Sequence, residues 1–158
     1  MKNKLLIFLL LLISVYNSSF AEEFKFETSK IELLDNGKLI KALKGKAISV
    51  DQNIEVEALK FEYNKDLDVL KAYDGIANIK SDNIQIKFEE IKIDQNQSLI
   101  STINKTKIID LKRNVVLQTQ NVSYDKKNKI LESDYKSILK DDSNNKISMN
   151  SFEYNNNN

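Results

Sequence analysis

Residues 44–64 read Lys-Gly-Lys-Ala-Ile-Ser-Val-Asp-Gln-Asn-Ile-Glu-Val-Glu-Ala-Leu-Lys-Phe-Glu-Tyr-Asn, and much of this stretch returns thirty residues further along the chain. Looser copies follow from Asn114 and from Ile147. A period of this length is typical of a supersecondary unit that cannot bury its apolar face alone and therefore stacks on its neighbours. The matching positions of the first two copies are Gly45 and Gly75, Ala47 and Ala77, Asn53 and Asn83, Ile54 and Ile84, and Val56 and Ile86.

Within each copy the apolar residues alternate with polar ones and then change parity. Ile54 and Val56 alternate with glutamates, whereas Phe61 lies on the opposite parity. The same change follows Phe88 and Thr119. Because successive side chains of a strand point to opposite faces, such a slip keeps apolar residues on one face only if the chain turns a corner or forms a bulge. The pattern predicts an all-β fold built from stacked short antiparallel strands.

The segments around the repeats also indicate strands and turns. A first strand is expected from Phe24 onward, where apolar and charged residues alternate. Asp35-Asn36-Gly37 indicates a hairpin turn, because Asn and Gly tolerate positive φ. Short polar turns are expected at 64–68, 94–98 and 125–129.

The composition argues against most kinds of catalytic and metal site. The chain has 158 residues without any Cys or His, which removes thiol chemistry, the most frequent general base and the most frequent metal ligand. Carboxylate pairs such as Glu55 and Glu57 suit a solvated strand face, and Asp66-x-Asp68 offers far fewer oxygens than calcium takes. We therefore expect no enzyme activity, no cofactor and no metal. With 24 Lys+Arg against 23 Asp+Glu and no basic stripe, nucleic acid is not an expected partner.

The first 21 residues have the pattern of a cleaved secretory signal. Lys2 and Lys4 precede an apolar run from Leu5 to Ile13, and Ser19-Phe20-Ala21 places small residues where a signal peptidase needs them. The run is short for a transmembrane anchor, which needs about 20 apolar residues. We expect cleavage after Ala21, a single domain over residues 22–158, and export to a periplasm, where a chain without Cys needs no disulfide.

The apolar face of the stacked strands allows two interpretations. The Ile, Val, Phe and Leu side chains can fill a closed core, or they can line a seam that stays partly unfilled and holds a long hydrocarbon. A stack of this kind also has an open strand edge at each end, and such edges pair with other sheets unless they are blocked. The C-terminal edge carries no Pro or lysine block, which favours docking with a further β-unit.

The repeats resemble the OstA-like family of lipopolysaccharide-transport proteins, which includes the periplasmic bridge protein LptA and the N-terminal domain of the outer-membrane protein LptD. The resemblance rests on Gly45-Lys-Ala47, on Ile54-Glu-Val56-Glu-Ala58 followed by Phe61-Glu-Tyr63, and on Leu70-Lys-Ala72-Tyr-Asp-Gly75-Ile-Ala77. It covers roughly residues 24–154, and the later copies match more loosely. The end at Asn158 suits a piece of a longer, LptD-like protein slightly better than a free LptA-like domain.

The resemblance implies a twisted, repeat-built β-jellyroll that is open along one side like a folded taco. Its apolar groove would carry the acyl chains of lipid A, and its edges would pair with other transport domains to assemble lipopolysaccharide at the outer membrane. The alternative function is a structural β-solenoid, a surface or filament module with a closed core and no lipid. The residues expected to face inward are Ile54, Val56, Phe61, Ile84, Ile86, Phe88, Ile91, Val115, Leu117 and Val122.

Overall fold

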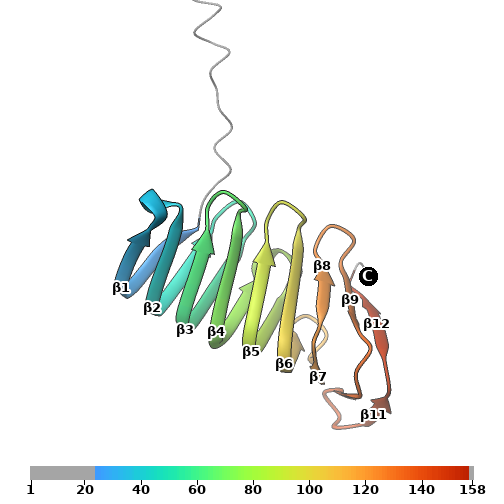
Figure 1. The fold of residues 1–158 in the computed structure, drawn as a ribbon. Coiled ribbons are helices and arrows are strands. Elements are labelled where there is room, and N and C mark those ends of the chain that lie inside the picture. Colours follow the sequence, from blue (N-terminus) through green and yellow to red (C-terminus); the bar gives the residue numbers. More distant parts are fainter. Residues whose placement is uncertain (1–23, 157–158) are drawn as a thin grey trace, which may run out of the picture.

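The computed structural model describes residues 24–156, and these form one open antiparallel sheet of twelve strands (Figure 1). The described residues contain two short 3-10 turns and no α-helix, so none of them forms a helix long and apolar enough to cross a membrane. The expected signal at residues 1–21 lies outside the described residues. The all-β class expected from the alternating pattern is confirmed.

The strands follow one another in the sheet in the order of the chain through β7, because each hairpin pairs neighbouring segments. Beyond β6 the sheet divides, with β7, β10 and β11 on one side and β8, β9 and β12 on the other. The 3-10 turns are η1 (Asp35–Gly37) and η2 (Lys80–Asp82). The strands are β1 (Lys25–Leu34), β2 (Leu39–Ser49), β3 (Ile54–Asn64), β4 (Val69–Ile79), β5 (Ile84–Asp94), β6 (Leu99–Asp110), β7 (Val115–Gln120), β8 (Ser123–Asp125), β9 (Ile130–Ser133), β10 (Ser137–Lys140), β11 (Lys146–Met149) and β12 (Phe152–Asn155).

Each long strand bends near its middle, where the ladder skips one residue. Lys44, Asp74 and Asn104 have positive φ at the bends of β2, β4 and β6, and Leu59 and Glu89 are left out of the pairing in β3 and β5. A residue with positive φ turns the chain sharply without ending the strand. The change of parity that the sequence shows is this bend.

Glycine is required at two of the bends by close approach of a neighbouring strand. A Cβ atom added at Gly45 would collide with the carbonyl oxygen of Glu27, and one added at Gly75 would collide with that of Glu57. Gly45 also has φ +154. The spacing of these two glycines in the sequence thus reflects the same packing constraint at the bends of β2 and β4.

The bends divide the sheet into two facing halves. Half A contains the strand ends next to the turns at 35–38, 65–68, 95–98 and 126–129, together with β8, β9 and β12. Half B contains the other strand ends, next to the turns at 50–53, 80–83 and 111–114, together with β7, β10 and β11. Figure 1 shows the two halves one in front of the other.

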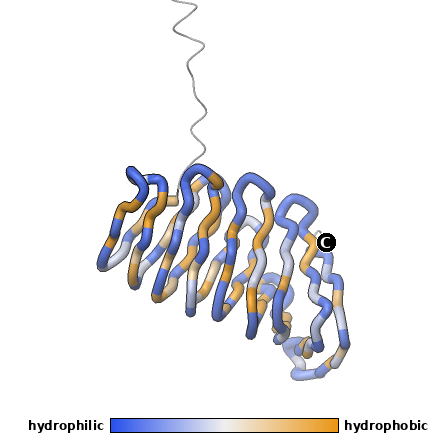
Figure 2. The backbone as a smooth tube through the Cα atoms, in the orientation of Figure 1, coloured by the Kyte–Doolittle hydropathy of each residue, from blue (hydrophilic) through white to orange (hydrophobic). Residues whose placement is uncertain are grey.

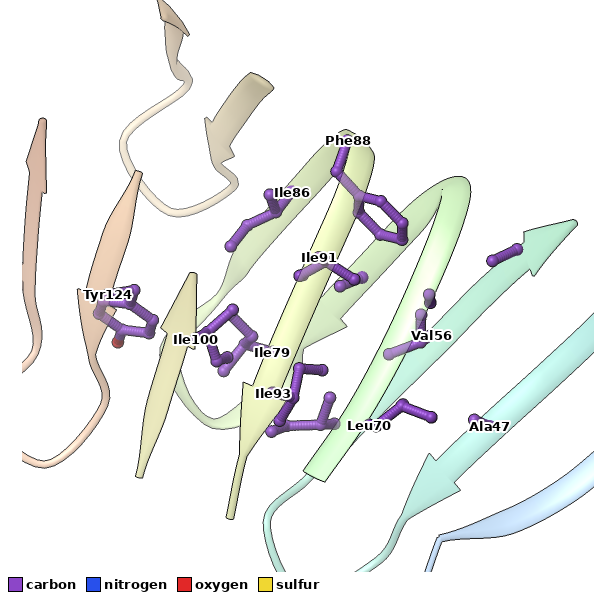
Figure 3. Packing of buried hydrophobic residues seen from close by; sticks show 14 of the residues in the cluster. Ala47, Val56, Leu70, Ile79, Ile86, Phe88, Ile91, Ile93, Ile100 and Tyr124 are labelled. Carbon is purple, nitrogen blue, oxygen red and sulfur yellow. The ribbon is translucent and has the colours of Figure 1, made fainter. Parts of the chain in front are cut away.

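The core lies between the halves and forms one cluster (Figure 3). In half B the buried residues of β3 are Ile54, Val56 and Ala58, and after the bend Phe61 and Tyr63 of half A are buried. Polar residues alternate with them and face outward, which gives the alternating colours along the strands in Figure 2. The bend therefore brings both parities of one strand into the same core.

Candidate functional site

The ten residues expected to face inward do so, and all except half-buried Val115 are buried. Phe61, Ile91 and Val122 belong to half A. The other seven belong to half B, and Figure 3 shows Ile86 and Phe88 among them. The structure thus brings these residues together into one apolar interior, which is the candidate site.

The interior is filled by side chains from both halves. Phe24 of half B meets Tyr63 of half A with ring centroids 5.5 Å apart, and Phe26 meets Phe61 at 5.9 Å. Sheets that pack face to face lie about 10 Å apart, a distance that Ile, Leu and aromatic side chains from both sides can span. Of the two interpretations that the sequence left open, the filled core describes the described strands in this state.

A small cavity remains at the C-terminal end of the interior. It measures about 20 Å³ and is lined by residues that include Ile108, Leu117, Leu131, Leu139 and Tyr154. That volume is close to the space one water molecule occupies, so an acyl chain does not fit there unless the halves separate.

The rim opposite the bends is closed by three groups of polar contacts, each centred on an aspartate. In the first, Ser49 of half B donates a hydrogen bond to Gln95 Oε1 at 2.7 Å. Gln95 Nε2 in turn donates to Asp68 Oδ1 at 2.6 Å, and the hydroxyl of Tyr63 donates to the same oxygen at 2.7 Å. Through Gln95, this Asp68 contact joins the end of β2 in half B to half A.

The second group is centred on Asp82, which lies in the turn between β4 and β5. The hydroxyl of Tyr124 donates to Asp82 Oδ2 at 2.7 Å, and the ammonium of Lys129 lies 3.5 Å from Oδ1. Asn156 Nδ2 donates to the backbone carbonyl of Asp82 at 2.9 Å. Burial, followed by the hydrogen bond to Asp82, raises the pKa of Tyr124 well above its usual value, so this hydroxyl keeps its proton as a donor.

The third group is centred on Asp110 at the end of β6. Tyr154 donates its hydroxyl to Asp110 Oδ2 at 2.5 Å, and Arg113 Nη1 lies 2.7 Å from the same oxygen. Burial and the bond to Asp110 raise the pKa of Tyr154 to about 12. Burial opposes ionisation of Asp110, yet hydrogen bonds from Tyr154 and Arg113 bring its pKa below the usual value. Together the three contacts hold the halves closed along the rim.

Sequence reasoning missed these rim contacts. The bonded pairs lie 46, 42 and 44 residues apart in the sequence. These separations are not multiples of the thirty-residue repeat, because each pair joins a residue of half B to a residue of half A. One signal was available, since Tyr124 and Tyr154 are thirty residues apart and both donate to an aspartate.

The carboxylates considered as ligands or catalysts have structural contacts. Glu55 accepts hydrogen bonds from Lys46 at 2.7 Å and from Lys80 at 2.8 Å, and these bonds lower its pKa to about 2. Asp66 pairs with Lys38 at 2.8 Å. Over residues 24–156, no three acidic side chains gather in a way that would hold a metal ion.

The interior is uncovered at both ends of the described sheet. β1 pairs only with β2, and its inward-facing Ile31 and Leu33 are 47% and 64% exposed. At the other end β11 pairs only with β10, and inward-facing Ile147 is 58% exposed. Each end thus combines a free strand edge with apolar side chains that continue the core.

No known protein-family model matches the chain, and a comparison with curated proteins finds no significant match.

Proposed function

We propose that this chain is a periplasmic module of lipopolysaccharide transport, which takes lipid A acyl chains between its two halves and docks edge to edge with other β-modules of the same kind. In this proposal the bent sheet is the twisted, repeat-built open jellyroll of the OstA-like family. The module hands its cargo along a continuous sheet to the assembly machinery of the outer membrane. Export depends on the signal expected at residues 1–21.

The observation that carries the proposal is the apolar interior that runs from one end of the described sheet to the other and is uncovered at both. A globular domain that ends in an exposed edge with Ile31 and Leu33 beside it has an aggregation liability unless a partner covers it. Pairing with a further strand satisfies the backbone groups of that edge and covers the apolar side chains at once. The same pairing extends the interior into the next module.

Acyl chains enter this interior only when the halves separate. Separation breaks the Asp68, Asp82 and Asp110 contacts but leaves the strand pairing within each half intact. Each buried CH₂ group contributes about 0.8 kcal/mol, so several acyl chains supply enough free energy to offset the loss of a few hydrogen bonds. The ten inward-facing residues then contact the chains, with no polar recognition of the hydrocarbon.

A photo-crosslinking amino acid tests this proposal. Placed at Phe61, which is buried in the interior, it should capture lipopolysaccharide in cells of a lipopolysaccharide-producing bacterium. The matched control is the neighbouring position Glu62, whose side chain faces outward and pairs with Lys60. Equal capture at both positions, or none at Phe61, would refute the lipid-carrier function.

The filled interior favours a second candidate function, a structural β-solenoid that never opens. Its core contacts and its rim contacts would then serve stability alone. The solenoid function predicts purification without bound lipid and no lipid capture at Phe61, while head-to-tail association through the two ends remains.

A further inference from the structure

We propose that the outer surface of half B, toward the C-terminal end, binds an anionic lipid surface. This basic face is defined by the outward-pointing lysines of β5, β6, β10 and β11: Lys87, Lys105, Lys107, Lys140 and Lys146. The inference goes beyond the proposed function, because it concerns the outer surface and does not require the interior to open.

The pairing register places these lysines on one surface. Lys87 lies opposite Lys107, Lys107 opposite Gln118, and Gln118 opposite Ile138. Their neighbours along each strand, such as Ile86 and Ile108, are buried in the core, so these positions point outward. From β5 to β11, the paired outward positions of half B carry Lys, Gln, Ser, Ile and Val, whereas acidic residues occur at the bend (Glu89) and in the turn between β10 and β11 (Asp141 and Asp142).

Like charges face each other twice on this surface. Lys87 lies directly opposite Lys107, and Lys140 lies directly opposite Lys146. Like charges directly opposite destabilise an antiparallel pair. Nearer the N-terminal end of half B, by contrast, Glu55 accepts from both Lys46 and Lys80. Within residues 24–156 none of the five lysines of the basic face makes an ion pair, so their ammonium groups are available to an external anion.

A hollow lies among three of these lysines. It has a volume of about 450 Å³ and is lined by Lys87, Lys105 and Lys107. Asp74 and Glu89 also line it, at the bend, where Glu89 lies in the bulge opposite Lys105. The hollow has room for the phosphate of one lipid headgroup, with the remaining lysines left to meet neighbouring headgroups.

The outer surface of half A has the opposite charge over the same strands. Glu90, Asp125, Glu132 and Glu153 point outward there against one lysine of these strands, Lys92, and Glu132 lies directly opposite Glu153. An anionic surface would therefore attract one outer surface of the molecule and repel the other, which would orient the module.

An extended lipid surface suits the basic face better than a compact anion does. The charges of the basic face are all lysines, which act as point charges, and Arg113 in the nearby β6–β7 turn is already paired with Asp110. Ile109, Val116 and Ile138 point outward among them and can contact the headgroup region. Lysines near an anionic membrane each strengthen binding about fivefold.

Vesicle co-sedimentation of the chain from Glu22 onward, which contains every described strand, tests the inference. We expect binding to vesicles of phosphatidylcholine mixed equally with phosphatidylglycerol, and much weaker binding to phosphatidylcholine alone. Removing two charges in K87Q/K107Q should weaken binding to the anionic vesicles about 25-fold, and K140Q/K146Q should have a similar effect. Both changes remove a like-charge pair, so neither is expected to unfold the sheet.

The matched control is K41Q/K71Q, which removes two outward lysines of half A that flank Glu62. It should leave vesicle binding within about twofold, because these lysines are not on the basic face. An equal loss in the control would show that net charge alone governs binding and would overturn the inference. Equal binding to both vesicle types, or no binding to either, would also overturn the inference. The same holds if inorganic phosphate alone saturates the basic face, or if the protein sediments without vesicles because it self-associates through these charges. Each of these outcomes is independent of crosslinking at Phe61, so the two proposals can fail separately.

Discussion

The bend is formed differently in the first six strands and in the last six. β2 to β6 each pass through the bend as one continuous strand of 11 or 12 residues. In the later part the chain breaks at the bend, so that β7 and β8 replace one long strand, as do β9 with β10 and β11 with β12. Where the thirty-residue spacing is regular, the strand continues through the bend after a residue is left out of the pairing. Where it slips, the ladder ends and restarts.

The two regions also differ in how the interior is stabilised. The continuous strands bury large apolar side chains almost completely, including Ile86 and Ile91. The interrupted strands bury fewer, and the Asp82 and Asp110 contacts to Tyr124 and Tyr154 hold the halves together there. Packing therefore dominates in the first region, and polar contacts contribute more in the second.

The largest expected effect comes from making a cavity in the continuous region. Ile86→Ala removes a fully buried side chain and should lower the free energy of unfolding by about 4 kcal/mol. Leu139→Ala in β10 truncates a half-buried residue beside the existing cavity and should cost only about 1–2 kcal/mol. Urea unfolding of the two variants measures the difference, and equal losses would contradict the contrast between the regions.

The bends provide the next largest effect. Gly75→Ala places a Cβ against the backbone of Glu57 and should lower the free energy of unfolding by about 3 kcal/mol. Gly37→Ala is the control, because nothing lies within 4 Å of its added Cβ and only its φ of +84 opposes the change. The control should cost about 1 kcal/mol. If Gly75→Ala proves as mild as the control, the bend does not depend on close strand approach.

The rim contacts should differ from each other when their tyrosines lose the hydroxyl. Tyr124→Phe leaves buried Asp82 with Lys129 at 3.5 Å and should cost about 2 kcal/mol. Tyr154→Phe should cost about 1 kcal/mol, because Asp110 keeps Arg113 at 2.7 Å and the backbone amide of Lys112 at 2.9 Å. Thermal or urea unfolding checks the order, and equal losses in the two variants would show that the Arg113 pair adds nothing.

The smallest effect concerns pH and the outer surface of the continuous region. Hydrogen bonds from Lys46 and Lys80 hold the pKa of Glu55 at about 2 in the folded chain, against about 4.3 when unfolded. A lowered pKa contributes stability that is present above the unfolded value and is lost as the pH falls toward 2. Because the Lys46 and Lys80 side chains are 41% and 61% exposed, solvent screening reduces this contribution to about 1 kcal/mol. Glu55→Gln should therefore be less stable than the parent at neutral pH and equal to it near pH 2, as measured by urea unfolding across that range.

The sequence predicted what depends on side-chain parity. Alternation at Ile54 and Val56 followed by the slip before Phe61 is a local pattern, and it predicted both the strands and their bends. The filling of the interior depends on the distance between the halves, which no local pattern records. The rim contacts depend on how the two halves face each other, which brings Asp82 next to Tyr124, 42 residues away in the sequence and not at the thirty-residue spacing of the repeat.

Bridging the rim tests most directly whether the halves must separate to admit lipid. Gln52 and Lys126 lie on opposite halves, where Lys126 Nζ donates to the carbonyl of Gln52 at 2.8 Å, and the chain has no cysteine of its own. In Gln52→Cys/Lys126→Cys, a short bis-maleimide should abolish lipid capture by the crosslinker at Phe61, whereas the unbridged double variant should retain it. Undiminished capture in the bridged protein would contradict the account.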